Sequence, residues 1–265
     1  MTAEPVEAGY EDPEGWAERA AVVYRPLARL LVQRCSPIRF EPGMRVLDAG
    51  TGTGLVADAL AAAGGLRVVG VDRSAAMLAH RRAARPPGVQ ADALRLPFAD
   101  GSFDAWVGAF LLNHLPPEQP LREAARVLRP GGAVLASTWP AVQDDPVKAA
   151  IDEVARRAGW VPPGWYGEMK RDLDAVSGDP DRLGALATQA GLVEVEARTV
   201  SARLEGPTAA AIVDYRLALP HYTAWRAEAA PETLAAVRQL GAAAVQTILD
   251  GEGWTLRMVV LAARA

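Results

Sequence analysis

The chain is poor in the residues that carry most redox and metal chemistry. It has one cysteine, Cys35, and three histidines among 265 residues. A single cysteine excludes an intramolecular disulfide, and the Cys and His residues lack the spacing of a metal site, so we expect no bound metal and a reducing, cytoplasmic setting. No apolar run approaches the roughly 18 residues that a membrane-spanning helix needs, which argues against stable membrane insertion.

Lysine is equally scarce, since Lys148 and Lys170 are the only two. The net charge is −4 and the arginines are spread along the chain, so no basic patch of the kind that binds nucleic acid is expected, and a small molecule is the expected partner. Residues 1–15 are acidic and rich in Pro and Gly, without the basic start and apolar core of a secretory signal, and we expect a flexible arm there. The oligomeric state is left open, and a homodimer is compatible with the sequence.

What the sequence does contain is an alternation of short apolar segments and helical patterns from residue 44 to residue 138. Hydrophobic residues make up 50% of the chain, enough to form a substantial core. Strands are expected at 45–49, 67–71, 89–91, 103–110 and 133–137, and helices at 55–63, 74–84 and 118–128. Such an alternation is typical of a parallel sheet covered by helices.

After Thr138 the pattern changes to two helical blocks around a strand. Helices are expected at 146–158, 180–190, 208–217 and 231–249, and strands at 192–200 and 255–262. No repeat or low-complexity linker separates these blocks. We therefore expect an N-terminal arm and cap helix over residues 1–43, followed by one domain over residues 44–265 with helical insertions at about 140–190 and 205–250.

The most informative stretch, residues 46–54, joins the first expected strand to the first expected helix. Gly50, Gly52 and Gly54 remove three Cβ atoms where a backbone and a ligand must approach closely. A dinucleotide-binding loop has glycines at its first, third and sixth positions, and the sixth position here is Leu55, which weakens a nicotinamide assignment. A phosphate-binding P-loop needs Gly-Lys-Ser/Thr, and no lysine occurs near this turn.

Acidic residues end three successive strands: Asp48, Asp72 and Asp92. In an open parallel sheet, ligands bind in the crevice outside the carboxyl ends of the strands, so all three carboxylates would face one crevice. A ligand with an ammonium group, a ribose diol and an exocyclic amine could use a carboxylate at each of these points. S-adenosylmethionine is such a ligand.

Residues 44–138 resemble a class I S-adenosylmethionine-dependent methyltransferase, and more narrowly the small-molecule group similar to the quinone-biosynthesis C-methyltransferases. The resemblance lies in five motifs that occur in family order, at residues 46–54, 70–78, 90–98, 102–104 and 126–132. It implies an α/β fold with a Rossmann-like, seven-stranded, mostly parallel sheet, helices on both faces, an antiparallel last strand, and helical insertions that form a substrate lid. Residues 140–265 match only loosely, and they would decide the substrate.

The resemblance also implies which residues bind the methionine end of the cofactor. Asp48 would hold the glycine-rich turn, directly or through a water that reaches the methionine amine. Gly50, Gly52 and Gly54 would pass beneath the methionine and ribose. Ala109 and Phe110 would border the sulfonium, and Tyr24 would close over the methionine.

A second group of residues would bind the nucleoside end. Asp72 would accept hydrogen bonds from both ribose hydroxyls. Arg73 and Met77 would pack on the adenine face. Asp92 would accept a hydrogen bond from the adenine amine, and the Ala93 amide would meet a ring nitrogen.

Methyl transfer from a sulfonium is an in-line displacement, so the protein needs a base only if the acceptor must lose a proton. His114 follows the fourth expected strand, near the cofactor, and is one candidate catalytic residue. His221 lies in the helical block expected to cover the acceptor, and we hypothesise that His221 or Tyr222 is the acceptor-side acid or base. The alternative for His221 is a surface loop between helices, and His80 is expected to face solvent.

Aromatic residues gather in the two insertions, as Trp160, Trp165 and Tyr166 in one and Tyr215, Tyr222 and Trp225 in the other. They either line an acceptor pocket or form a small satellite core that fixes the helices to the sheet. Trp16 is expected in the N-terminal arm, where it could fold over the site as a lid.

These observations predict an S-adenosylmethionine-dependent methyltransferase that methylates O, N or C of a small, fairly apolar metabolite, natural-product intermediates included. The alternative is a methyltransferase-fold protein that binds the cofactor but catalyses a cyclisation or rearrangement without methyl transfer, because fold does not fix function. An RNA or protein methyltransferase would need a basic face or a recognition domain, and the acidic balance argues against it.

Overall fold

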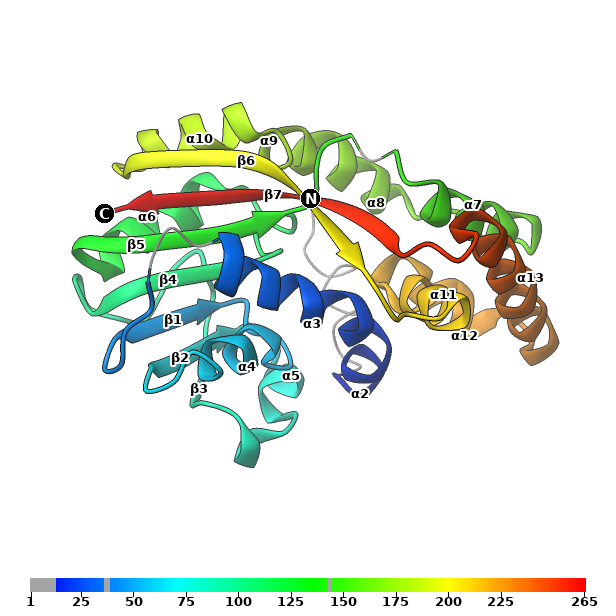
Figure 1. The fold of residues 1–265 in the computed structure, drawn as a ribbon, viewed down its shortest axis with the longest axis horizontal. Helices are drawn as coiled ribbons and strands as arrows, with labels where there is room; N and C mark the ends of the chain where they lie inside the picture. Colours follow the sequence, from blue (N-terminus) through cyan, green and yellow to red (C-terminus); the bar gives the residue numbers. More distant parts are fainter. Residues whose placement is uncertain (1–12, 36–38, 143) are drawn as a thin grey trace.

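The protein is represented by a computed structural model that describes residues 13–35, 39–142 and 144–265. In these residues seven strands form one sheet, in the order β3-β2-β1-β4-β5-β7-β6 (Figure 1). Strands β1 to β5 are parallel, and β7 is antiparallel to both neighbours, β5 and β6. The predicted Rossmann-like sheet with an antiparallel last strand is therefore confirmed. Strand order reverses between β1 and β4, where an open α/β sheet places its ligand crevice.

The seven strands follow the predicted order and differ from prediction mainly at their ends. Their bounds are β1 Arg45–Ala49, β2 Arg67–Asp72, β3 Gly88–Gln90, β4 Phe103–Ala109, β5 Leu128–Thr138, β6 Val193–Leu204 and β7 Trp254–Arg264. Strand β5 starts earlier than predicted because Leu128 already pairs with Phe103, across a register shift. Strands β6 and β7 are longer than predicted because they pair with each other from Val193 opposite Arg264 to Leu204 opposite Trp254.

Helical segments precede, connect and follow the strands. The chain is helical from Pro13 to Cys35, through α2 Pro13–Gly15, η1 Trp16–Ala20, α3 Ala21–Leu30 and η2 Leu31–Cys35. Between the parallel strands lie α4 Leu55–Ala61, α5 Ala75–Ala79, η3 Arg82–Ala84 and α6 Glu118–Val127. Between β5 and β6 lie α7 Pro146–Arg157, α8 Gly164–Met169, η4 Lys170–Asp174, α9 Ala175–Ser177 and α10 Pro180–Gln189. Between β6 and β7 lie α11 Ala209–Ala218, η5 Pro220–Tyr222, α12 Thr223–Glu228 and α13 Pro231–Leu249.

The single helix predicted over residues 74–84 is broken into two pieces. Ser74 caps α5, since its Oγ accepts a hydrogen bond from the Met77 amide. The helix ends at His80, which is extended, and Arg81 is left-handed with φ 52°. A residue with a Cβ rarely adopts that conformation, so it stops the helix before η3 begins.

The last three residues of the predicted N-terminal arm, 13–15, are helical. Residues 1–12 lie outside the described residues, and the chain is already helical at Pro13. Trp16, predicted to lie in the arm, belongs to η1 and stacks on Tyr24 with ring centroids 5.2 Å apart. Val23 and Leu27 on the same helical run are fully buried, so packing against the sheet holds this helix in place.

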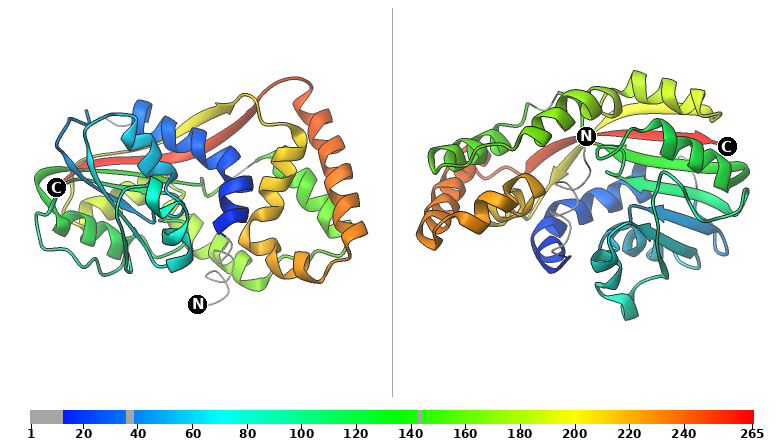
Figure 2. Two further views of the ribbon diagram at one scale, coloured as in Figure 1. Left: turned by 90° about the horizontal axis from the view of Figure 1, so that it is seen from below. Right: turned by 180° about the vertical axis from the view of Figure 1, so that it is seen from behind.

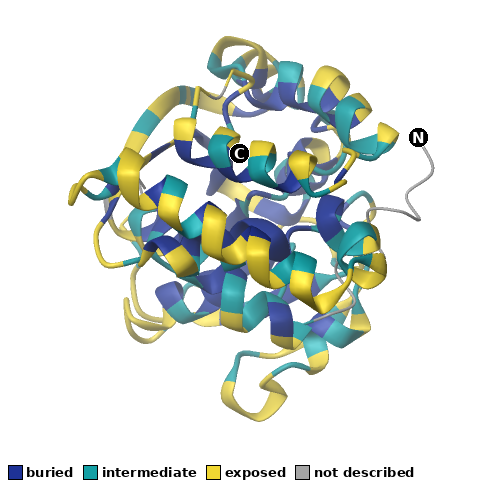
Figure 3. Cartoon of the chain, turned by 90° about the vertical axis from the view of Figure 1, so that its right-hand side faces the viewer, coloured by how far each residue is buried: buried dark blue, intermediate teal, exposed yellow. Residues whose placement is uncertain are grey.

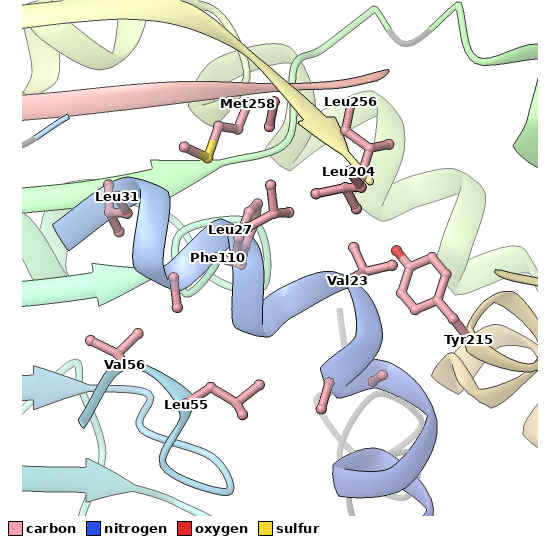
Figure 4. Close-up of a cluster of buried hydrophobic side chains, with 14 of the residues drawn as sticks. Val23, Leu27, Leu31, Leu55, Val56, Phe110, Leu204, Tyr215, Leu256 and Met258 are labelled. Atoms are coloured by element: carbon pink, nitrogen blue, oxygen red, sulfur yellow. The ribbon is translucent and has the colours of Figure 1, made fainter. Parts of the chain in front are cut away.

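Helices cover both faces of the sheet (Figures 1 and 2), with α3 and α4 on one face and α6 and α10 on the other. Successive residues of a strand point to opposite faces, so Leu135 of β5 packs in the α3 layer while Val134 and Ala136 pack in the α6 layer. Figure 4 shows the first layer, in which Leu27 of α3 lies between β7 and α4. Exposed residues concentrate on the outer faces of the helices (Figure 3).

A helical lobe stands beside the sheet, where α7, α11 and α13 pack on one another. The parallel strands point toward it, and the long strands β6 and β7 reach into it (Figures 1 and 2). Helix α11 also contacts η1 and α3, so the N-terminal helix bridges sheet and lobe. This arrangement places α7 of the first predicted insertion and α11 of the second next to the carboxyl ends of the strands. Within the described ranges, none of the helices has the length and apolarity needed to cross a bilayer.

Candidate functional site

The glycine-rich turn between β1 and α4 is left-handed at each of its three glycines. The φ angles are 69° at Gly50, 51° at Gly52 and 93° at Gly54, a region that side chains disfavour. A Cβ built on Gly50 would lie 2.9 Å from Leu111 Cδ1, so this position also lacks room. A Cβ on Gly52 meets no protein atom within 4 Å, and the backbone there is open to a ligand.

Two of the predicted strand-end acids hold this turn. Asp48 is fully buried beneath it and accepts a hydrogen bond from Thr51 Oγ1 at 2.6 Å. Asp72, at the end of β2, accepts from the Gly52 amide at 2.8 Å and from the Ser74 amide at 3.0 Å. Burial raises the pKa of Asp48 to about 7, against the opposing hydrogen bond from Thr51.

Arg85 is a third support of the turn, and no motif in the sequence pointed to it. Its guanidinium donates to the Gly52 carbonyl at 2.7 Å, to the Met77 carbonyl at 3.1 Å and to Thr51 Oγ1 at 2.9 Å. One cation therefore joins the turn to α5. Its charge also lowers the pKa of Asp48, although burial outweighs it.

A cavity of about 750 Å³ lies over this turn, at the carboxyl ends of β1, β2 and β4. Ten of the twelve residues predicted to bind the cofactor line it, namely Tyr24, Gly50, Gly52, Asp72, Arg73, Met77, Asp92, Ala93, Ala109 and Phe110. The other two do not. Asp48 lies beneath the turn, and Gly54 is the N-cap of α4, where a Cβ would meet Arg85 at 3.4 Å.

The walls of this cavity fit S-adenosylmethionine. Asp72 accepts two hydrogen bonds from backbone amides, and Asp92 accepts one from the Leu94 amide at 2.9 Å. An ionised carboxylate offers about four such sites, so both acids keep acceptors for hydroxyl or amine donors of a ligand. The open backbone at Gly52 and the apolar wall at Met77 complete a surface for a nucleoside.

Aromatic rings border the end of the cavity next to β4. Phe110, just past β4, is left-handed with φ 56°, an uncommon conformation for a bulky residue and one that often occurs at functional sites. Its ring lies 5.2 Å from Tyr24 and 4.6 Å from Trp139, between centroids. Tyr24 in turn lies 6.0 Å from Tyr215 of the helical lobe. The cluster thus connects the sheet, the N-terminal helix and the lobe.

A second cavity, of about 360 Å³, adjoins the first beyond this cluster and shares Tyr24 and His114 with it. Its walls come from both predicted insertions. The aromatic and imidazole rings that line it are Tyr24, His114, Trp139, Trp165, Tyr166, Tyr215 and His221. The charged residues that line it are Asp145, Lys148, Asp152, Arg156, Lys170, Asp174 and Arg216.

The aromatic residues of the insertions divide between the two predicted alternatives. Trp165, Tyr166 and Tyr215 line the second cavity. Trp160 and Tyr222 instead stack on each other at 4.2 Å, both almost fully buried, and form a satellite core. The Tyr222 hydroxyl donates to Asp152 Oδ1 at 2.6 Å, and Tyr222 lines neither cavity.

The buried charges of the second cavity occur in pairs. Arg216 donates through Nε and Nη2 to the two oxygens of Asp152, both at 2.8 Å. Lys170 donates to Asp174 at 2.6 Å, and the Asn113 side-chain amide donates to the same carboxylate at 3.1 Å. The first pair joins α11 to α7, and the second, through Asn113, joins η4 to the segment after β4. No three His, Cys, Asp or Glu side chains in the described ranges gather closely enough to hold a metal ion.

His221 is buried, with 7% of its surface exposed, so the surface-loop alternative is wrong. Its ring stacks on Tyr166 at 4.0 Å, and its Nε2 has no hydrogen-bond partner among the described residues. Burial, with the charges of Arg216 and Lys170, holds the pKa of His221 well below its usual range. The imidazole is therefore neutral at physiological pH.

The other two histidines differ in position. His114 lies on the wall between the cavities, and burial lowers its pKa to about 4. His80 ends α5, is half-buried rather than facing solvent freely, and lines neither cavity. Two neutral imidazoles therefore face the second cavity.

Lys148 is a residue of this site that the sequence reasoning missed. It is 9% exposed, its Nζ lies 4.2 Å from the centroid of the Trp139 ring, and burial lowers its pKa to about 7. One signal was available. Lys148 and Asp152 are four residues apart on a predicted helix, so they share a face with buried Ile151.

Comparison with known families agrees with this geometry. Residues 47–136 match the sequence model of a family described as a methyltransferase domain. The demethylmenaquinone methyltransferase of Mycobacterium bovis (strain BCG / Pasteur 1173P2) is 36% identical over 153 residues, which are 57% of this chain and 61% of that relative. The match therefore spans less than two thirds of the relative's length.

Solved structures share the fold. Phosphoethanolamine N-methyltransferase 2 of Haemonchus contortus, solved with phosphomonomethylethanolamine and S-adenosylhomocysteine, superposes with a TM-score of 0.55 at 22% identity over 91% of this chain and 52% of that chain. The [4+2]-cyclase SpnF superposes with a TM-score of 0.52 at 19% identity over 91% of this chain and 80% of that chain. Fold, turn geometry and family match show that residues 47–136 are similar to class I methyltransferase domains, whose cofactor is S-adenosylmethionine, and to the quinone-biosynthesis methyltransferases.

Proposed function

We propose that this protein transfers the methyl group of S-adenosylmethionine to a small metabolite bound in the second cavity. The observation that carries the proposal is that the two cavities share a wall, formed by Tyr24 and His114. A donor in the first cavity and an acceptor in the second would meet at that wall, and alignment is the main requirement of an in-line displacement.

In this proposal the cofactor lies across the glycine-rich turn. Asp72 would accept from the ribose hydroxyls and Asp92 from the adenine amine, since both line the cavity with acceptor sites to spare. When bound, S-adenosylmethionine supplies an electrophilic methyl group, and its sulfur keeps the electrons of the broken C–S bond. The faces of Tyr24 and Phe110 would stabilise positive charge at that end of the cavity.

A hydroxyl or carbon acid would have to lose a proton as the new bond to the methyl carbon forms. His221 and His114 are the candidates to accept it, because each is neutral at physiological pH and lines the second cavity. The burial of His221 also limits water at the reacting atoms.

The size and walls of the second cavity restrict the acceptor. A volume of about 360 Å³ lies at the lower end of the range for small-molecule sites, roughly 300 to 1,000 Å³. The aromatic rings suit the fairly apolar molecule expected, and the charged side chains of the same wall suit polar groups on it. We propose a cytoplasmic enzyme that acts on such an intermediate, as in natural-product biosynthesis.

The proposal is tested by incubating the protein with S-adenosylmethionine that carries an isotopic label on the methyl group, together with a panel of small acceptors. The expected result is label in the acceptor and formation of S-adenosylhomocysteine. Conversion of an acceptor without label transfer would instead support a cyclisation or rearrangement. Calorimetry with S-adenosylhomocysteine and with NAD checks the cofactor, and binding of NAD alone would contradict the assignment.

Replacing His221 by asparagine is expected to lower turnover of a hydroxyl acceptor by about 100-fold, because general-base catalysis contributes on that order. The affinity for S-adenosylhomocysteine should stay the same, since His221 does not line the first cavity. His80→Asn is the matched control, because His80 lines neither cavity. Turnover equal to that of the control would assign the proton to another group, and His114→Asn would then be the variant to measure.

A further inference from the structure

Cationic side chains outnumber carboxylates on the wall of the second cavity. Four cationic residues line it, namely Lys148, Arg156, Lys170 and Arg216, against three carboxylates, Asp145, Asp152 and Asp174. Each of these cations has a carboxylate within 4.0 Å, since Arg156 pairs with Glu153 at 3.7 Å and the other three pair with the carboxylates of the wall. An anion in the cavity would therefore bind to N–H donors that these pairs leave unused.

Arg216 has a donor to spare. Its Nε and Nη2 both bind Asp152, and the described residues offer no hydrogen-bond acceptor to its Nη1. The side chain is 8% exposed, so solvent has little access to it. A buried guanidinium with an unused N–H on a cavity wall is a ready site for a carboxylate oxygen.

Lys148 lies close to the wall that the two cavities share. Its Nζ is 3.5 Å from Asp145 Oδ2, at the long end of an ion pair, and 4.2 Å from the centroid of the Trp139 ring. Trp139 in turn contacts Phe110 and Tyr24, whose ring centroids lie 4.6 and 6.0 Å away. Two aromatic rings, Trp139 and then Phe110 or Tyr24, thus lie between Lys148 and the cofactor cavity.

Burial lowers the pKa of His221 and that of Lys148, and Arg216 and Lys170 lower both further, while Asp145 raises the pKa of Lys148. The unused N–H of Arg216 favours an acceptor with an anionic oxygen over a protonated amine, because an ammonium group offers only donors. His221 Nε2, buried and without a partner in the described part of the chain, offers one further polar contact.

We propose that the acceptor is a small aromatic monoanion, an aryl carboxylate, whose anionic group is held by Arg216 and Lys148 and whose ring packs among the aromatic side chains of the cavity. The inference rests on the proposed function, because it names the substrate class of the same site. In this orientation the carboxylate is held at the cationic wall, and the part of the ring that faces Tyr24 and His114 would carry the nucleophile.

The test uses three probes of similar size and different charge: benzoate, benzamide and benzylamine. Their binding to the full chain saturated with S-adenosylhomocysteine is measured by calorimetry, and by fluorescence of the cavity tryptophans. Benzoate is expected to bind about tenfold or more tightly than benzamide, as for a gained hydrogen bond to a charged group, and benzylamine should bind weakest. In Lys148→Met the benzoate affinity should fall by about tenfold, and the preference over benzamide should narrow.

Arg238→Met is the matched control, because Arg238 forms an exposed ion pair with Asp214 and lines neither cavity. A thermal melt checks that Lys148→Met is folded, and binding of S-adenosylhomocysteine checks the first cavity. Equal affinities for benzoate and benzamide in the wild type, or unchanged benzoate affinity in Lys148→Met, would overturn the inference. If the proposed function is correct and this inference is wrong, the protein would still transfer the methyl group to a neutral acceptor.

Discussion

Replacement of Gly52 by valine is expected to abolish binding of S-adenosylhomocysteine. Gly52 lines the cofactor cavity, and a Cβ there meets no protein atom within 4 Å, so the added side chain would extend into open space over the turn. The φ of 51° would also strain a β-branched residue, at a cost of about 1–3 kcal/mol in unfolding free energy. Calorimetric titration of the purified variant, with a thermal melt, measures both effects.

Gly131→Val separates strain from steric exclusion. Gly131 is also left-handed, with φ 77°, and a Cβ there likewise meets no protein atom within 4 Å, but it lines neither cavity. Both variants should lose comparable stability, and only Gly52→Val should lose the ligand. Wild-type affinity in folded Gly52→Val would place the cofactor elsewhere and contradict the assignment of this cavity.

Replacement of Asp152 by alanine is expected to lower the free energy of unfolding by about 3–5 kcal/mol, the usual cost of leaving a buried charge without its partner. Arg216 would lose the acceptors of its Nε and Nη2, and Tyr222 would lose the acceptor of its hydroxyl. These groups lie in α7, α11 and η5, so the loss falls on the helical lobe. Urea denaturation followed by circular dichroism gives the measurement.

Asp214→Ala is the matched control for this loss. Asp214 pairs with Arg238 at 3.0 Å, but the two side chains are 39% and 47% exposed. Exposed pairs contribute about 0–1 kcal/mol, so the control should lose little stability. If both variants lose the same amount, the Arg216 ion pair is no more important than a surface contact, and the lobe is held by apolar packing instead.

The parallel half of the fold could be predicted because its signals are local. The apolar run from Arg45 to Ala49, the glycines that follow it and the strand-end Asp72 lie in short segments whose spacing sets strand, turn and ligand crevice. Ten of twelve predicted cofactor residues line the cavity for this reason. Asp48 does not line it because its side chain lies beneath the turn and binds Thr51, and Gly54 does not because it is the N-cap of α4, next to Arg85.

The acceptor side could not be predicted in the same way, because its contacts join distant segments. Arg216 and its partner Asp152 are 64 residues apart in the sequence. The same holds for one contact on the cofactor side, since Arg85 and Gly52 are 33 residues apart. No periodicity or motif marks such pairs. The break at Arg81 has a related cause, since a left-handed residue other than glycine is set by its surroundings and not by helix propensity.

The wall shared by the two cavities also makes their ligands thermodynamically dependent on each other. Tyr24 and His114 touch both spaces, so any shift of these side chains that the donor causes alters the affinity for the acceptor, and linkage requires the converse effect to be equal. In the proposed reaction the sulfur loses its positive charge beside Tyr24 and Phe110. The two substrates therefore influence each other's affinity differently from the two products. This difference changes how readily the products dissociate after methyl transfer.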